Sequence, residues 1–374
     1  MTVVIFSHSV LSDWNHGNAH FLRGVVTELQ HRGHAVTVFE PDDGWSVVQA
    51  IADAGDDVLD ATRARFPGLQ VVRYGGLPDL DAALEHADLV IVHEWNSHEL
   101  VQAIGRHRAC HPGYVLLFHD THHRSVSDPA AMAAYDLSQY DGVLAFGEVI
   151  RQRYLTQGWA RRAWTWHEAA DVRVFHPRAG VARTGDLVWI GNWGDDERSA
   201  ELQEFLIEPV RALGIQATVY GVRYPPEALA MLAEAGIEHR GWLPNYRVPD
   251  VFAAHRVTIH VPRRPYARLL PGIPTIRPFE ALACGIPLLS APWHDAERLF
   301  TAGRDYLTAC TGAEMTAHLH AILNDDALAL SLASHGVRAI RRRHTCAHRV
   351  DQLLGIVADI QAAVPGPASW TVGV

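Results

Sequence analysis

The chain has 374 residues, a formal net charge of −10 and a pI of about 6.2. At roughly 100–200 residues per domain, this length suggests two domains. The acidic balance disfavours a surface that binds nucleic acid or an anionic membrane. No apolar run reaches the ~18 residues that a membrane-spanning helix needs.

Cysteine and histidine usage gives no sign of a disulfide framework or a metal site. The four cysteines lie far apart without a C-x-x-C pair, so we expect reduced thiols. The 24 histidines show neither zinc-finger nor H-E-x-x-H spacing, and we expect no metal ligand among them. The first residues lack the basic region and cleavage site of a signal peptide, which makes a cytoplasmic location the expectation.

The first part of the sequence alternates apolar, β-branched runs with helical segments. Five such runs are typical of strands buried on both faces: residues 3–7, 35–39, 88–93, 114–118 and 142–146. Between the first two, Asn18 begins a segment with apolar residues at helical spacing up to Leu29. This alternation predicts a doubly wound parallel sheet, in which ligands bind beyond the carboxyl ends of the strands.

A polar stretch within residues 167–186 predicts a linker, and a second series of strands and helices follows it. Its expected strands are residues 187–191, 217–220, 257–261 and 286–290, and its expected helices are residues 198–213 and 279–283. The tail over 327–363 is predicted to be helical with a break at His335–Gly336, and residues 364–367 a frayed end. We expect domains at 1–175 and 180–345, and a C-terminal helix and tail at 346–374.

The segment Arg277-Pro278-Phe279-Glu280-Ala281-Leu282-Ala283-Cys284-Gly285-Ile286-Pro287 has the chemistry of an anion site. Thr275 and Ile276 lead into a short helix, whose first N–H groups and positive dipole end attract anions. Arg277 adds a charged guanidinium group, whose paired N–H donors match the oxygens of a phosphate. Glu280, one turn on, could accept hydrogen bonds from two vicinal hydroxyls. Taken alone, the same residues fit an ordinary helix–strand connection equally well.

The pattern Arg-x-Phe-Glu-Ala-Leu-Ala-Cys-Gly-x-Pro resembles the donor-binding signature of GT-B glycosyltransferases. The resemblance is strongest to the spore-maturation (CgeB-like) branch and the glycosyl transferases group 1, and residues 297–306 continue it. It implies an α/β protein of two Rossmann-like β/α/β domains facing across a cleft, with a C-terminal helix returning toward the N-terminal domain. It also implies that Glu280 binds a nucleotide ribose and that the amides around Thr275 and Ile276 bind the diphosphate.

One position departs from the family pattern. Many retaining members carry a second glutamate eight residues before the one that matches Glu280, where it contacts the donor sugar. This sequence has Gly272 there. Whether the reaction retains or inverts the anomeric configuration therefore stays open.

Four further residues are candidates for binding the donor. Asn192 lies in a glycine-rich turn after a strand, where the backbone could approach phosphate closely, and Arg198 follows it. His260 and Arg263 belong to an arginine-rich run after another strand, which could neutralise a diphosphate leaving group. A glycine-rich surface turn, a solvated basic loop and a satisfied strand-end histidine are the alternative interpretations.

The catalytic group should come from the first domain. Asp13 and His16 follow the first strand, and His119 and Asp120 follow a later one. A histidine near a carboxylate could deprotonate an acceptor hydroxyl, with the carboxylate orienting the imidazole. Each residue taken alone is also typical of a cap or a loop hydrogen bond.

Two other groups of residues could contribute to the site. The stretch His167–Asp171 resembles the hinge of such enzymes, although an ordinary linker would look the same. Trp14, Trp95, Trp193 and Trp293 stand at loop or strand-end positions, where an indole could stack on a sugar or base or pack in the core.

These features predict a metal-independent, hexosyltransferase-type enzyme without a cofactor. It would move a sugar from a nucleotide-diphosphate sugar to an acceptor hydroxyl, with arginines and a helix dipole in place of Mg²⁺. The acceptor could be a carbohydrate, a lipid-linked molecule or a small molecule, and peripheral membrane contact and oligomeric state stay open. A nucleotide-sugar epimerase or hydrolase of the same fold, or a non-catalytic nucleotide-sugar-binding homologue, are the alternatives. A dinucleotide oxidoreductase is disfavoured because no G-x-G-x-x-G follows the first strand.

Overall fold

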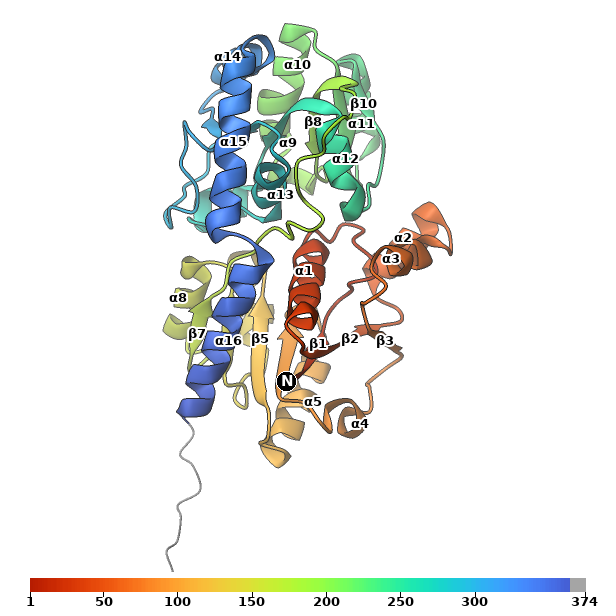
Figure 1. Cartoon of the computed structure of the whole chain (residues 1–374), viewed down its shortest axis with the longest axis vertical. Coiled ribbons are helices and arrows are strands. Elements are labelled where there is room, and N and C mark those ends of the chain that lie inside the picture. The colour runs from red at the N-terminus through yellow and green to blue at the C-terminus, as the bar shows by residue number, and fades with distance from the viewer. Residues whose placement is uncertain (364–374) are drawn as a thin grey trace, which may run out of the picture.

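The computed structural model describes residues 1–363 and contains two parallel β-sheets, one above the other along the long axis of the molecule (Figure 1). We call them, with their helices, the N-terminal half and the C-terminal half. The frayed end predicted over residues 364–367 lies outside the described residues.

The N-terminal half is built on seven strands in the order β3-β2-β1-β4-β5-β6-β7. The strands are β1 (Thr2–Phe6), β2 (Ala35–Pro41), β3 (Val71–Tyr74), β4 (Leu89–His93), β5 (Val115–Asp120), β6 (Gly142–Ala145) and β7 (Ala163–Thr165). The helices are α1 (Asn18–His31), α2 (Trp45–Ala54), α3 (Val58–Arg65), α4 (Leu80–Leu84), α5 (His98–Cys110), α6 (Arg124–Ser127), α7 (Pro129–Ala133) and α8 (Glu148–Thr156).

The C-terminal half is built on six strands in the order β10-β9-β8-β11-β12-β13. The strands are β8 (Gly185–Ile190), β9 (Ala217–Tyr220), β10 (Ile237–His239), β11 (His255–His260), β12 (Leu288–Ser290) and β13 (Leu307–Thr308). The helices are α9 (Ser199–Leu202), α10 (Glu208–Leu213), α11 (Pro226–Glu234), α12 (Val248–Ala253), α13 (Ile276–Cys284), α14 (Gly312–Asn324) and α15 (Asp326–Arg343), and helix α16 (Cys346–Ala362) follows them in sequence. Short 3-10 or π-helical turns lie at Asp195–Glu197, Gln203–Ile207, Asn245–Arg247 and Pro265–Leu269.

Both sheets are doubly wound, as predicted, because the order of strands reverses beside the first strand of each series. All strand pairs are parallel, and successive side chains alternate between the two faces. In the N-terminal sheet Val3 and Ile5 pack toward α1, while Val4 and Phe6 pack toward α5 and α8. Each sheet is thus covered by helices on both faces, which explains why the sequences of its strands are continuous apolar runs.

The C-terminal tail differs from its prediction in one respect. The sequence predicted a helix break at His335–Gly336, but α15 continues through both residues and ends at Arg343. The reason is packing: a Cβ on Gly336 would come within 2.7 Å of the Leu282 side chain, so the glycine lets α15 lie directly against α13. The break comes instead at His344–Thr345, where the Thr345 side chain caps α16.

Helix α16 belongs to the N-terminal half, although it follows the C-terminal half in sequence (Figure 1). The chain crosses between the halves once after β7 and again before α16. The two crossings bond to each other, because Ala170 N–H donates to the His344 carbonyl (3.0 Å) and Cys346 N–H donates to the Ala170 carbonyl (3.0 Å). The two chain crossings therefore form one two-stranded junction between the halves.

Within residues 1–363, no helix combines the length and the apolar character that crossing a membrane requires.

Replacing Leu353 by alanine should destabilise the N-terminal half. Leu353 of α16 is fully buried with Phe21 and Val25 of α1, so truncation leaves a cavity. We expect a loss of about 2–5 kcal/mol in the free energy of unfolding, measured by denaturant titration. Leu330→Ala on α15 is the control, since that side chain is 69% exposed. Equal stability of the two variants would show that α16 adds little to the core.

Candidate active site

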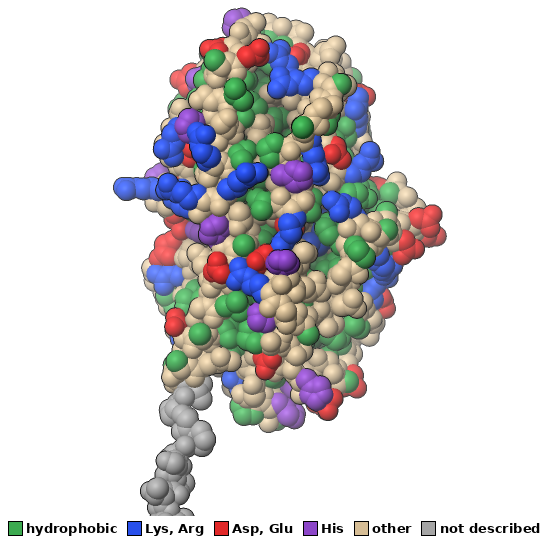
Figure 2. Space-filling model, in the orientation of Figure 1, with side chains coloured by type: hydrophobic (Ala, Val, Ile, Leu, Met, Phe, Trp, Pro, Cys, Tyr) green, Lys and Arg blue, Asp and Glu red, His purple; other side chains and the backbone are tan. Residues whose placement is uncertain are grey.

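A cleft of about 800 Å³ lies between the two halves, at the carboxyl ends of both sheets. The residues that follow β1, β4, β5 and β6 form its N-terminal wall, and those that follow β8, β9 and β11 form its C-terminal wall. On the face that Figure 2 shows, arginines and histidines gather across the middle of the molecule, where the halves meet. Ligands of doubly wound sheets bind at such an edge.

The N-terminus of α13 opens onto the cleft, with Thr275, Ile276 and Arg277 on the wall. Thr275 has φ 61° and ψ −178°, a backbone conformation that costs a non-glycine residue about 1–3 kcal/mol. Gly17 of the β1–α1 loop approaches so closely that a Cβ there would lie 3.0 Å from Ile276 Cγ2. A strained turn at a nine-residue helix thus presents its free N–H groups to the cleft.

Glu280, which the family resemblance assigns to a nucleotide ribose, is fully buried and is not among the residues that line the cleft. One carboxylate oxygen accepts a hydrogen bond from His20 Nδ1 (2.9 Å), and the other pairs with Arg277. His20 Nε2 accepts the Asp171 N–H (3.0 Å), so the neutral ring carries its proton on Nδ1 and donates it to Glu280. Glu280 therefore holds Arg277 and α13 in place from within the protein.

Arg198 and Asn192 both line the cleft, but most of their polar atoms are engaged. The guanidinium of Arg198 donates to the carbonyls of Asn192 and Val261 (3.0 Å to the latter) and lies over the Trp189 ring. Burial and the nearby Arg263 lower the pKa of Arg198 to about 9. Arg198 thus supplies positive charge to the wall while its donors fix the loop after β8.

Asn192 connects the halves. Its side-chain amide bonds to the side chain of Asn15 across the cleft, and its amide oxygen accepts the Val222 N–H (3.0 Å).

Arg263 reaches the cleft and pairs with Glu197 at 2.9 Å. His260 lies on the wall and contacts the Ser290 hydroxyl (2.9 Å), and burial lowers its pKa to about 3. His260 is accordingly uncharged at neutral pH.

Two of the four predicted catalytic residues lie on the cleft wall. The Asp13 carboxylate accepts a 2.8 Å bond from Arg23 and the backbone N–H of Asn245 (3.1 Å), so it is neutralised by a structural pair. His16 lines the cleft, and burial holds its pKa well below the usual range.

The other two, His119 and Asp120, are fully buried and are not among the residues that line the cleft. Strand alternation sends them to opposite faces of the sheet. The His119 ring lies between Phe21 and Trp166, and burial lowers its pKa to about 3. Asp120 accepts hydrogen bonds from the Tyr154 hydroxyl (2.9 Å) and the His122 N–H (3.1 Å).

The sequence reasoning missed Glu168 as a site residue. It follows β7 in the predicted hinge, is 5% exposed and lines the cleft. Burial, together with the nearby Glu280, raises the pKa of its carboxyl to about 8. The resemblance of this stretch to a hinge was the one signal that could have identified it.

Indole rings cover much of the N-terminal wall. Trp14, Trp45 and Trp95 line the cleft, and Trp14 and Trp45 meet edge to face at 6.0 Å. Trp193 and Trp293, which were also candidates for ligand stacking, pack instead against the cores of the C-terminal half. The wall opposite the arginines is thus largely aromatic.

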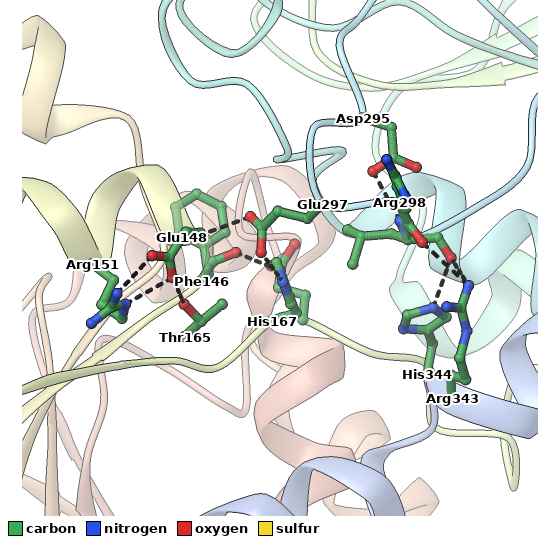
Figure 3. Close-up of polar contacts among 12 residues, drawn as sticks. Phe146, Glu148, Arg151, Thr165, His167, Asp295, Glu297, Arg298, Arg343 and His344 are labelled. Carbon is green, nitrogen blue, oxygen red and sulfur yellow. Dashed lines mark hydrogen bonds and ion pairs between the residues drawn. The ribbon is translucent and has the colours of Figure 1, made fainter.

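A polar contact closes the two halves beside the cleft (Figure 3). Glu297 of the C-terminal half accepts the Glu148 N–H at the start of α8 (2.8 Å) and lies 2.8 Å from His167 Nε2. His167 Nδ1 must donate to the Phe146 carbonyl (3.0 Å), since a carbonyl only accepts. The contact between Nε2 and the carboxyl therefore needs one more proton than a neutral histidine and an ionised glutamate carry.

One group of described residues has the geometry to hold a metal ion: Asp81, His107 and His111, with ligand atoms within 4.8 Å of one another. The group lies at α4 and the end of α5, at the edge of the N-terminal sheet remote from the cleft (Figure 1). The two histidines are one helical turn apart in the sequence.

Replacing Glu297 by alanine should weaken the contact between the halves. The Glu148 N–H and His167 Nε2 then lose the carboxyl group that they share, at a cost of about 1–3 kcal/mol in the free energy of unfolding. Denaturant titration measures this loss. Glu297→Gln is the control, because its side-chain carbonyl can still accept the Glu148 N–H and it should lose less stability. Equal losses in the two variants would contradict this role of the carboxyl group.

Comparison with known proteins identifies a matching family model and solved structures with a similar fold. Residues 198–355 match the family model described as glycosyl transferase-like. The structure of HepE from Anabaena in complex with UDP has a TM-score of 0.67 and 14% identity, over 96% of this chain and 100% of that one. Sucrose-phosphate synthase from Thermosynechococcus elongatus gives a TM-score of 0.65 and 13% identity over 97% and 100% of the two chains.

AviGT4, a glycosyltransferase involved in avilamycin A biosynthesis, has a TM-score of 0.63 and 16% identity over 97% of this chain and 99% of that one. No curated protein sequence matches the chain significantly. At these identities the structural likeness shows the fold, and the family model covers the C-terminal half. The chain is thus a GT-B fold protein with a glycosyl transferase-like C-terminal half.

Proposed function

We propose that the protein transfers a sugar from a nucleotide-diphosphate sugar to an acceptor hydroxyl. The observation that carries this proposal is the cationic C-terminal wall of the cleft, which is lined by the N-terminus of α13 and by four arginines: Arg198, Arg223, Arg263 and Arg277. A diphosphate carries the charge that such a wall would neutralise. HepE, which has the same fold, has been solved in complexes with UDP and with UDP-glucose, which makes UDP-sugars the first donors to test.

The acceptor would lie against the N-terminal wall. Its indole rings, Trp14, Trp45 and Trp95, offer apolar faces on which a sugar ring or another flat, partly apolar group can stack.

In this reaction the bond between the anomeric carbon and the diphosphate breaks, and negative charge grows on the leaving group. Arg277 and the α13 N–H groups are fixed before the substrate arrives, so their attraction strengthens as the charge develops. We propose that these groups serve where other transferases use a divalent cation. Equal rates of transfer in excess EDTA and in Mg²⁺ would support this role, and loss of transfer in EDTA would contradict it.

The donor is best identified by thermal shift with UDP-, GDP-, dTDP- and CMP-sugars, followed by transfer assays with the stabilising one. One selective donor that is consumed only when an acceptor is present would support glycosyl transfer. Donor turnover without any acceptor would point to an epimerase or hydrolase. Donor binding without transfer or turnover would point to a binding protein.

Arg277→Ala should weaken donor binding by roughly 10- to 100-fold, because a charge-assisted hydrogen bond contributes about 1.5–3 kcal/mol. The same change leaves the buried Glu280 carboxylate without its partner, at a cost of about 3 kcal/mol in stability. The double variant Arg277→Ala/Glu280→Gln separates the two effects. It should recover thermal stability but not donor affinity, measured by calorimetry. Recovery of both would show that Arg277 acts only through the fold.

A further inference from the structure

Glu168 occupies a particular position in the cleft. It lies on the first crossing between the halves, directly after β7, and its side chain reaches the cleft wall. Asn18, the first residue of α1, donates to one of its carboxyl oxygens at 2.9 Å. Within residues 1–363, no hydrogen bond to its other oxygen is found. One oxygen is thus fixed by the protein and the other is free for a ligand.

The backbone around Glu168 is held firmly. Arg349 of α16 is 3% exposed, and its guanidinium donates to the carbonyls of His167 (2.8 Å) and Glu168 (3.4 Å). The neighbouring His167 side chain is tied to Glu297 of the C-terminal half. The carboxyl group is therefore placed by α1, by α16 and by the contact that closes the halves, which is the preorganisation that a catalytic group needs.

The surroundings of Glu168 suit proton transfer near neutral pH. Burial and the nearby Glu280 raise the pKa of its carboxyl to about 8, although Arg277 opposes part of the rise. A carboxylate with a pKa this high is a better base than an exposed one, and a general base is most effective when its pKa lies near the working pH. The influence of Arg277 also shows that the carboxyl lies close to the cationic end of the cleft.

The other candidates on the cleft wall are less suited to this role. Asp13 is paired with Arg23, and burial keeps the pKa values of His16 and His122 well below their usual range. His119 and Asp120 lie away from the wall. Glu168 is the remaining carboxyl on the wall, and it keeps one oxygen open.

We propose that Glu168 is the general base of the transfer reaction. Its carboxylate takes the proton of the acceptor hydroxyl as that oxygen forms its bond to the anomeric carbon. The bond from the anomeric carbon to the diphosphate breaks, and the nucleoside diphosphate leaves with the electron pair. This role rests on the proposed function.

Glu168→Gln tests the role with little change of shape, because the Gln carbonyl can still accept the hydrogen bond from Asn18. We expect kcat to fall by about 10²–10⁴-fold, while the thermal shift caused by the donor stays as in the wild type. In the wild type, kcat should rise tenfold per pH unit and level off above about pH 8, because the base works only when deprotonated. The variant should lose this rise. Glu227→Gln, an exposed change on α11, is the matched control and should transfer like the wild type.

The outcomes distinguish the two levels of the proposal. A wild type that transfers beside an equally active Glu168→Gln overturns the role of Glu168 and leaves the proposed function standing. A variant that loses the donor-induced thermal shift shows that Glu168 holds the donor, which also overturns its role as a base. A wild type that transfers sugar from none of the donors overturns the proposed function, and the role of Glu168 with it.

Discussion

The buried carboxylate of Glu280 is the charge around which the two halves are arranged. A carboxylate without partners in a protein interior is costly, so its pairing with Arg277 and His20 must be kept whenever the protein is folded. His20 belongs to α1, stacks on Phe175 of the linker and accepts the Asp171 N–H. One buried charge thus fixes α13, α1 and the linker relative to one another. The geometry of the cleft wall depends on this arrangement.

The positive charge of the cleft is made entirely of arginine, because the chain contains no lysine. A guanidinium stays charged in sites where an ammonium group would lose its proton, and it has more hydrogen-bond donors than an ammonium group. Arg198 uses both properties, since it binds backbone carbonyls with its donors and still contributes charge to the wall. The arginines are therefore part of the scaffold as well as of the candidate site.

Much of the fold could be predicted from the sequence because the central strands of both sheets are buried on both faces. Such strands are continuous apolar runs, and β1, β4, β5, β8 and β11 lie within about two residues of their predicted positions. The edge strands β3, β10 and β13 lack this signal, since they are short and half exposed. The helix break was misplaced at Gly336 because the sequence does not show that α13 packs there.

The site was harder to predict than the fold. The residues after β8 and β11 and those before α13 do line one cleft, because carboxyl ends of parallel strands share one edge. Glu280 and Asp120 have the chemistry of site residues. In the structure, however, they form buried hydrogen bonds with His20 and Tyr154, which are distant in sequence. Glu168 gave no signal of its own, since its raised pKa and its place on the wall arise only when both halves are assembled.

The return of α16 to the N-terminal half has a consequence for synthesis of the protein. A chain leaves the ribosome from its N-terminus, and domains usually fold as soon as they emerge. Here the apolar face of α1 is covered by residues 346–362, which are made only after the whole C-terminal half. At a typical translation rate of 5–20 residues per second, residues 346–362 are made on the order of ten seconds or more after α1. During that interval the residues of α1 that pack against α16 lack their native partner.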